Sequence, residues 1–176
     1  MMLNITRTIG FALAFGFAGS AFAQETTTNR VSANTDWAVY VESEPTECWA
    51  VSAPKETTNT RDGNPVDVRR GDIQLIVFYR PAADVAGQVM FTGGYPFASG
   101  STVTMQVGET TFQMFTEGEF AWPANTEDDA KFVAAMKRGT DAVLTARSGR
   151  GTQTEDKFSL LGFTAAVDEA ASRCAS

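Results

Sequence analysis

The sequence contains no histidine, and this absence removes several classes of functional site. Imidazole is the commonest general base near neutral pH and the commonest ligand of transition metals. Ser-His-Asp and Cys-His catalytic sites are therefore excluded, as are zinc or iron sites built on histidine. We expect no cofactor and no metal centre of these kinds.

Positive charge is also scarce, with 14 Lys and Arg against 21 Asp and Glu in 176 residues, a formal net charge of −7. A chain this acidic is unsuited to neutralising a nucleic-acid backbone, so we expect no nucleic-acid partner. It would also be repelled by an anionic membrane surface. The length suits one domain with a proper core.

The first 23 residues are almost free of charge, since Arg7 is the only charged residue before residue 25. An apolar run at residues 9–18 follows, and the small residues Ala21 and Ala23 complete an Ala-x-Ala pattern. This arrangement predicts a secretory signal peptide over residues 1–23, cut between Ala23 and Gln24. The run is shorter than the roughly 20 residues that cross a bilayer. We therefore predict a periplasmic or secreted protein that does not span a membrane after cleavage.

Only two cysteines are present, Cys48 and Cys174, and both follow the predicted cleavage site. Because an exported protein meets an oxidising compartment, we expect them to form an intramolecular disulfide. Two separate thiols, or pairing with another chain, are the alternatives. No Cys-x-x-Cys motif is present, so the predicted bond has a structural role rather than a redox role.

The pattern of apolar residues divides the mature chain into a leader and one domain. Residues 24–35 are polar and lack periodicity, which predicts a flexible leader. Residues 36–176 show mostly period-two alternation, which is clear at residues 102–107. Residues 73–79 are apolar on both faces, as expected for a central strand. Residues 55–72 are polar and are expected to form a long loop.

Two features complete the predicted architecture of residues 36–176. Gly108 and Glu109 fit the central positions of a tight hairpin. Helical spacing occurs at residues 126–138, where Thr126 is a candidate N-cap and Asp129 follows three residues later, and again at residues 164–171. Many short strands with little helix predict an all-β fold, an antiparallel immunoglobulin-like β-sandwich with one or two short helices.

Three short motifs resemble segments of the invasion-associated locus B family. They are residues 101–107 with the following Phe112, the helical segment 129–139 and the strand-to-helix segment 158–166. The resemblance is strongest over residues 93–166. It implies an exported alphaproteobacterial protein with an immunoglobulin-like β-sandwich and no established enzymatic activity. Better-known members carry a cysteine pair between the hairpin and the helix, which residues 115–125 lack, so a role in host-cell invasion transfers poorly.

Aromatic and basic residues in two turns are the candidate binding residues. Tyr95 and Phe97, after two glycines, either form a platform for a peptide or glycan or cap one end of the core. Trp122 carries the same two interpretations. Arg147 and Arg150 flank a tight turn where guanidinium and backbone N–H groups could bind an anion, the alternative being a solvated hairpin tip.

Catalytic and metal-binding alternatives find less support in the residues. The acidic loop that contains Asp62, Asn64, Asp67 and Asp72 lacks the spacing of an EF-hand, which leaves a weak, irregular calcium site as the alternative. Ser159 and Lys157 could contact each other along one strand face, but no other residue supports a nucleophile there. We expect no catalytic residues and a protein that binds an unknown protein or cell-envelope component. The alternatives are a periplasmic small-ligand carrier or a histidine-independent envelope hydrolase.

Overall fold

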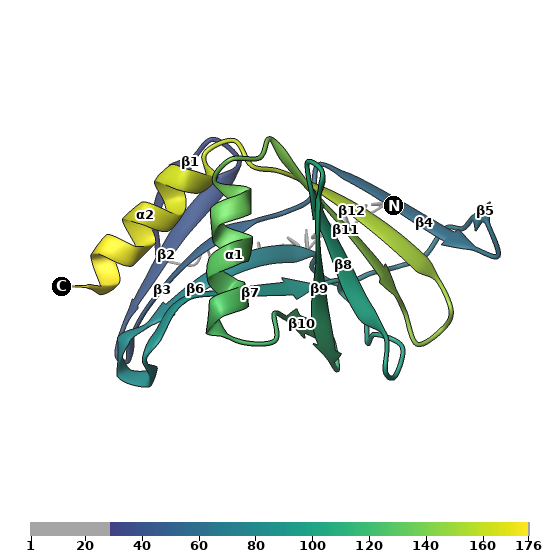
Figure 1. Ribbon diagram of the computed structural model, residues 1–176, viewed down its shortest axis with the longest axis horizontal. Coiled ribbons are helices and arrows are strands. Elements are labelled where there is room, and N and C mark those ends of the chain that lie inside the picture. Colours follow the sequence, from purple (N-terminus) through teal and green to yellow (C-terminus); the bar gives the residue numbers. More distant parts are fainter. Residues whose placement is uncertain (1–28, 176) are drawn as a thin grey trace, which may run out of the picture.

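The computed structural model describes residues 29–175, in which twelve strands form one antiparallel sheet (Figure 1). The order across the sheet is β1-β2-β3-β6-β7-β10-β9-β8-β11-β12-β4-β5, so β1 and β5 are its two edges. The strands are β1 (Arg30–Asn34), β2 (Trp37–Ser43), β3 (Thr46–Ser52), β4 (Glu56–Arg61), β5 (Asn64–Pro65), β6 (Gln74–Arg80), β7 (Val85–Thr92), β8 (Thr102–Val107), β9 (Thr110–Glu117), β10 (Phe120–Trp122), β11 (Asp141–Arg147) and β12 (Gln153–Ser159). A single 3-10 turn at Pro81–Ala83 separates β6 from β7.

The sheet folds over one hydrophobic core, which confirms the predicted antiparallel sandwich-like fold. Phe91 of β7 meets Phe158 of β12 edge to face, with ring centroids 6.1 Å apart, and both side chains are fully buried. These two strands belong to different halves of the sheet, so the contact shows that the halves face each other. Apolar burial of this kind is the main favourable contribution to folding.

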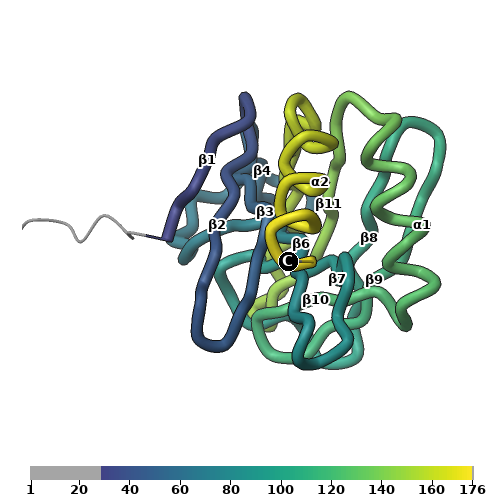
Figure 2. The backbone as a smooth tube through the Cα atoms, turned by 90° about the vertical axis from the view of Figure 1, so that its left-hand side faces the viewer, coloured from purple at the N-terminus to yellow at the C-terminus, as the bar shows by residue number. Residues whose placement is uncertain are grey.

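Two helices, α1 (Thr126–Met136) and α2 (Phe163–Cys174), complete the core (Figure 2). Phe132 of α1 packs against Phe112 of β9, with ring centroids 4.5 Å apart. Phe163 of α2 meets Trp37 of β2 edge to face at 4.8 Å. Both predicted helices are confirmed, although α2 continues to Cys174.

The N-terminus of α1 differs from the expected cap. Asn125, rather than Thr126, is the N-cap, and its Oδ1 accepts a hydrogen bond from the backbone N–H of Asp128 at 3.0 Å. Asp129 is buried and accepts a hydrogen bond from the backbone N–H of Val89 in β7 at 2.8 Å. Asp129 therefore joins the helix to the sheet instead of capping the helix.

The predicted disulfide between Cys48 and Cys174 is present, and it joins β3 to the last residue of α2. The Cα atoms are 5.9 Å apart, within the range that a disulfide spans without moving the backbone. Cys48 is fully buried. The bond thereby fixes the C-terminal helix to β3, the third strand from the β1 edge of the sheet.

The strand predicted to be central is β6, which pairs with β3 on one side and β7 on the other. Leu75 and Val77 are fully buried, and Ile76 on the opposite face is 6% exposed, as expected for a strand covered on both faces. The predicted hairpin at Gly108 joins β8 to β9 through a Val107–Thr110 pair. Gly108 has φ +57°, a conformation that favours glycine.

Two segments without an apolar pattern are strands, contrary to the sequence-based expectation. Arg30–Asn34, assigned to the flexible leader, form β1 and pair with β2. Glu56–Arg61, assigned to a long loop, form β4 and pair with β12. Both lie at or near a sheet edge and are mostly exposed, so neighbouring backbone rather than buried side chains holds them. The predicted signal peptide and its cleavage site lie outside the described residues.

Candidate functional site

A cleft of about 590 Å³ opens where three segments distant in sequence meet. These segments are the connection from β4 to β6, the loop after β7 and the hairpin between β11 and β12. The residues lining the cleft are Arg61, Asp67, Val68, Arg69, Arg70, Gly94, Tyr95, Pro96, Glu119, Ser148, Gly149, Arg150, Thr152 and Thr154. The volume is within the range of small-molecule sites in proteins. Tyr95 and Arg150, both predicted binding residues, thus come together.

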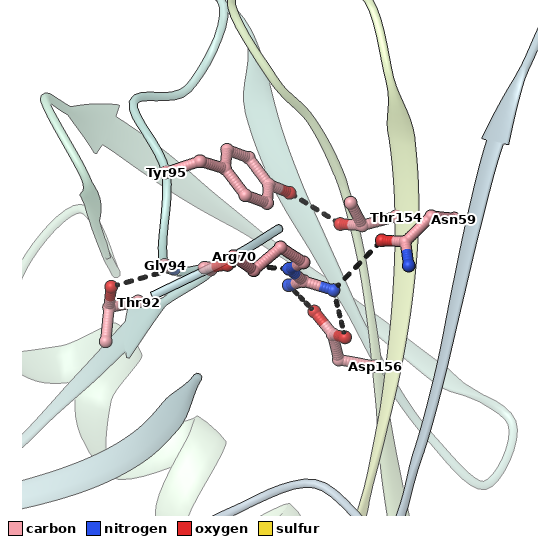
Figure 3. Close-up of polar contacts among 8 residues, drawn as sticks. Asn59, Arg70, Thr92, Gly94, Tyr95, Thr154 and Asp156 are labelled. Atoms are coloured by element: carbon pink, nitrogen blue, oxygen red, sulfur yellow. Dashed lines mark hydrogen bonds and ion pairs between the residues drawn. The ribbon is translucent and has the colours of Figure 1, made fainter. Parts of the chain in front are cut away.

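Arg70 and Asp156 form a buried ion pair at the base of this site (Figure 3). Two parallel hydrogen bonds join them, from Nη1 to Oδ1 at 2.7 Å and from Nη2 to Oδ2 at 2.6 Å. The Arg70 side chain is 6% exposed and that of Asp156 is fully buried. Burial raises the pKa of the Asp156 carboxyl, and the hydrogen bonds from Arg70 act in the opposite direction by stabilising its charged form.

Two further hydrogen bonds hold Arg70 to the protein. Its Nε donates to the carbonyl of Gly93 at 2.9 Å, and Nη1 donates to Oδ1 of Asn59 at 3.3 Å. The guanidinium therefore joins β4, β12 and the loop after β7. We assign Arg70 to shaping the cleft rather than to holding a ligand.

Tyr95 is half-buried against this ion pair. The guanidinium carbon of Arg70 lies 5.1 Å from the ring centroid, a cation–π contact, and the Tyr95 hydroxyl hydrogen-bonds Oγ1 of Thr154 at 2.5 Å. Burial raises the pKa of Tyr95, so its hydroxyl is neutral near pH 7. Phe97 packs edge to face on Tyr95 and is only 8% exposed, so Phe97 belongs to the core and Tyr95 alone of this pair lines the cleft.

A close backbone approach at Gly94 holds the cleft's two walls together. The N–H of Gly71 donates to the carbonyl of Gly94 at 2.8 Å. A Cβ on Gly94, which has φ +72°, would lie 2.6 Å from the carbonyl oxygen of Gly71. Glycine is thus required at position 94 for both conformation and space.

The turn between β11 and β12 is held by its own backbone. The N–H of Gly149 donates to the carbonyl of Pro96 at 3.0 Å, and that of Gly151 donates to the carbonyl of Ser148 at 2.9 Å. The N–H of Thr152 donates to Oγ of Ser148 at 3.1 Å. These donors, which the sequence interpretation placed at an anion, are used within the protein, so the side chain of Arg150 is the turn's contribution to the cleft.

Arg147 is exposed but does not line the cleft. The structure therefore separates the two arginines that the sequence interpretation placed together. Arg61 and Arg69, which that interpretation did not single out, occupy the rim instead, and Nη2 of Arg61 donates to Oγ1 of Thr152 at 2.8 Å. Arg61 lies in β4 and Arg69 in the connection to β6, so no local motif relates either one to Arg150.

A second candidate surface surrounds Trp122, which lies in β10 opposite Phe115 of β9. The Phe120 ring lies 6.1 Å from that of Trp122, centroid to centroid. Phe115 is 58% exposed and Phe120 is 43% exposed, whereas Trp122 is half-buried. We call Phe115, Phe120 and Trp122 the aromatic patch.

The sequence analysis did not identify Phe115 and Phe120 as candidate binding residues, although the pattern of β9 indicates that Phe115 is exposed. Phe112 and Met114 alternate toward the core in β9, and Met114 is fully buried. Because successive side chains of a strand point to opposite faces, Phe115 must then face outward. An aromatic residue on the outward face of a strand whose other face is buried therefore indicates a candidate binding residue.

In the part of the chain that the structure describes, Lys157 and Ser159 contact other residues, and the acidic residues do not form a metal-ligand cluster. Lys157 pairs with Glu56 at 3.8 Å, while Oγ of Ser159 accepts a hydrogen bond from the N–H of Leu161 at 3.2 Å. Within residues 29–175 no three acidic or cysteine side chains gather as metal ligands would. Neither helix of this region is long and apolar enough to cross a bilayer.

Comparison with known proteins supports the family suggested by the motifs. The family model described as invasion associated locus B (IalB) protein matches residues 37–171, which is most of the chain. A search of the curated proteins found no match, and a search of the solved structures found none either. The family match and the disulfide together support an exported protein.

Proposed function

The chain belongs to the invasion associated locus B family, and from this premise we propose that it is an exported, non-catalytic protein that binds a protein partner through the aromatic patch. The observation that carries the proposal is the exposure of Phe115 and Phe120, at 58% and 43%. Exposed aromatic side chains that cluster on one face are typical of protein-binding surfaces.

The geometry of the aromatic patch favours a folded contact surface over a flexible one. Its side chains project from β9 and β10, which pair with each other and are flanked by β8 and β7 within the sheet. Their backbone is therefore held in place before binding, which lowers the entropy lost when a partner docks. Large rigid aromatic side chains are also the residues that most often dominate binding energy.

Charge next to the aromatic patch indicates the chemistry of the partner. Glu117 pairs directly with Phe120 in the sheet, and Glu119 lies in the connecting turn; both are exposed. The protein as a whole carries a net charge of −7. A partner surface with apolar side chains surrounded by lysine or arginine would complement this arrangement.

The non-catalytic part of the proposal is supported by the ion pair below the cleft. The buried carboxyl of Asp156 is held by two hydrogen bonds from Arg70, so it is committed to a structural contact. A small-ligand carrier is the second candidate function, favoured by the cleft of about 590 Å³. That cleft is lined in part by charged side chains, including Arg61, Asp67 and Glu119, unlike an enclosed apolar cavity.

Photocrosslinking in the native cell tests the proposed partner surface. A photoreactive phenylalanine analogue at position 120 is expected to trap one recurrent protein, which mass spectrometry then identifies. The same analogue at Leu161, which is 59% exposed but outside the aromatic patch, is the matched control. The double substitution Phe115→Ser and Phe120→Ser should abolish capture by a probe at Glu119 without unfolding the protein, because both side chains are exposed.

Two results would contradict this function. One is the same set of trapped proteins at positions 120 and 161, which would indicate non-specific contact. The other is undiminished capture at position 119 after the double substitution, with a circular-dichroism melt showing the variant folded.

A further inference from the structure

Three arginines at the rim of the cleft have no carboxylate partner within residues 29–175, a property that they share with Arg30, Arg138 and Arg147, which lie outside this cleft. All four lysines of the described chain form ion pairs, as do Arg70, Arg80 and Arg173. Within residues 29–175, Arg61, Arg69 and Arg150 form none, and all three are exposed. On a protein of net charge −7, three such arginines lining one cleft are a local concentration of positive charge.

These three guanidinium groups reach the cleft from segments that are fixed independently. Arg61 ends β4 and donates to Thr152. Arg69 immediately precedes Arg70, which the buried ion pair holds in place. Arg150 lies at a turn anchored by the hydrogen bond from Gly149 to Pro96. Convergence from separate, anchored segments is expected of a site prepared for a ligand, since less ordering is then needed on binding.

Two carboxylates also line the cleft, and they define the ligand further. Asp67 and Glu119 are exposed there, so the exposed charges are three positive and two negative. A ligand with a single negative charge would gain little from this balance. A ligand with two or more anionic groups could reach separate arginines while avoiding the acids, and its hydroxyl groups could donate to them.

We propose that the cleft binds a small ligand with at least two oxyanion groups, carboxylate or phosphate, held by Arg61, Arg69 and Arg150. Guanidinium groups bind both kinds of oxyanion through paired, charge-assisted hydrogen bonds. Arg70 does not take part, because its side chain is buried and four hydrogen bonds hold it to Asp156, Asn59 and Gly93. The arginines of this site are distinct from the aromatic patch, although Glu119 lies between the two, in the turn from β9 to β10 and in the lining of the cleft.

Titration of the protein purified after export tests the site, with pyrophosphate and citrate as probes of the two oxyanion classes. We expect saturable binding of at least one probe by calorimetry, with amide NMR shifts confined to the cleft residues. Arg69→Gln and Arg150→Gln should each weaken binding about tenfold, which corresponds to about 1.4 kcal/mol. Tighter binding of pyrophosphate would assign a phosphate ligand, and tighter binding of citrate a carboxylate ligand.

Arg147→Gln is the matched control because it removes the same charge as Arg150→Gln. Arg147 is also exposed and lies on the same hairpin, but outside the cleft. We expect it to change the dissociation constant by less than about twofold, because Arg147 does not line the cleft and its guanidinium is not placed to hydrogen-bond the ligand. Equal weakening by Arg147→Gln and Arg150→Gln would overturn the proposal by showing diffuse charge attraction. No saturable binding of either probe at low-millimolar concentration would overturn it as well.

Discussion

Arg70 and Asp156 form a buried bidentate ion pair across 86 positions of sequence, with N–O distances of 2.7 and 2.6 Å. The arginine comes from the connection between β5 and β6, and the aspartate comes from β12. The pair therefore attaches an otherwise irregular segment to the sheet and sets the position of the cleft wall.

Removing one partner of this pair should destabilise the protein strongly. Asp156→Ala leaves the buried guanidinium of Arg70 without its counter-charge, and we expect a loss of about 3–5 kcal/mol in the free energy of unfolding. The double variant Arg70→Met with Asp156→Leu should recover most of this loss, because it leaves no buried charge. Urea denaturation measures both. A loss below about 1 kcal/mol for Asp156→Ala would contradict a buried, coupled pair.

Reducing the Cys48–Cys174 disulfide should lower stability by about 2–5 kcal/mol. The bond closes a loop of 126 positions, so breaking it restores much conformational freedom to the unfolded chain. A thermal melt with and without reductant measures the effect, with thiol titration confirming reduction. An unchanged melting temperature after complete reduction would show that the bond contributes nothing to stability.

Asp129 should make stability depend on pH in the acid range. Burial raises the pKa of this carboxyl above its ordinary value, although the hydrogen bond from the backbone N–H of Val89 acts in the opposite direction. The folded state therefore favours the protonated form, and this contribution to stability is lost as pH rises through the folded-state pKa. Asp129→Asn keeps an acceptor for Val89 and carries no charge. Its melting temperature relative to the wild type should increase from about pH 3 to pH 7.

A difference between Asp129→Asn and the wild type that stays constant with pH would contradict this prediction. Asp128→Asn is the control for removing an acidic charge from the same helix, because Asp128 is more exposed than Asp129 and its carboxylate contacts Asn125 and Lys131.

Leu75 in β6 tests the central position of that strand. Leu75→Ala should cost about 2–4 kcal/mol, because the side chain is fully buried and its removal leaves a cavity. Leu161→Ala is the matched control: Leu161 is 59% exposed, and a change there should stay within about 0.5 kcal/mol. Chemical denaturation of the two variants gives the comparison. Similar small losses at both positions would place β6 outside the packed core.

The parts of the fold that were predictable are those where burial leaves a pattern in the sequence. Residues 102–107 alternate, and they form β8 with those bounds. The apolar run at residues 73–79 corresponds to β6 within one residue at each end. In both cases the side chains that pack against the core are consecutive or alternate along one strand, so a local window contains the information.

Strands held by their neighbours' backbone could not be predicted in this way. Glu56–Arg61 form β4 because β12 supplies a hydrogen-bonding edge, and most of its side chains remain exposed. A polar sequence of this kind predicts a loop when the strand that pairs with it is unknown. The same explanation holds for β1, which pairs with β2.

In the candidate sites, too, some features could be predicted from the sequence and others depended on the tertiary structure. Tyr95, Trp122 and Arg150 stood out as residue types, but their roles depended on neighbours far away in sequence. Arg150 gains Arg61 and Arg69 as companions because the β4–β6 connection folds against the β11–β12 turn.

By itself the sequence determined the class of the protein: an acidic chain without histidine, two cysteines able to pair, and strands marked by alternating apolar residues. These properties depend on amino-acid composition or on short segments of the chain, and both can be read directly from the sequence. Only the tertiary structure decided that Arg70 is bound by Asp156, that three other arginines share a cleft, and that Phe115 and Phe120 join Trp122 on the surface. Such groupings arise from strand order and register, and contacts between distant residues leave no local trace in the chain.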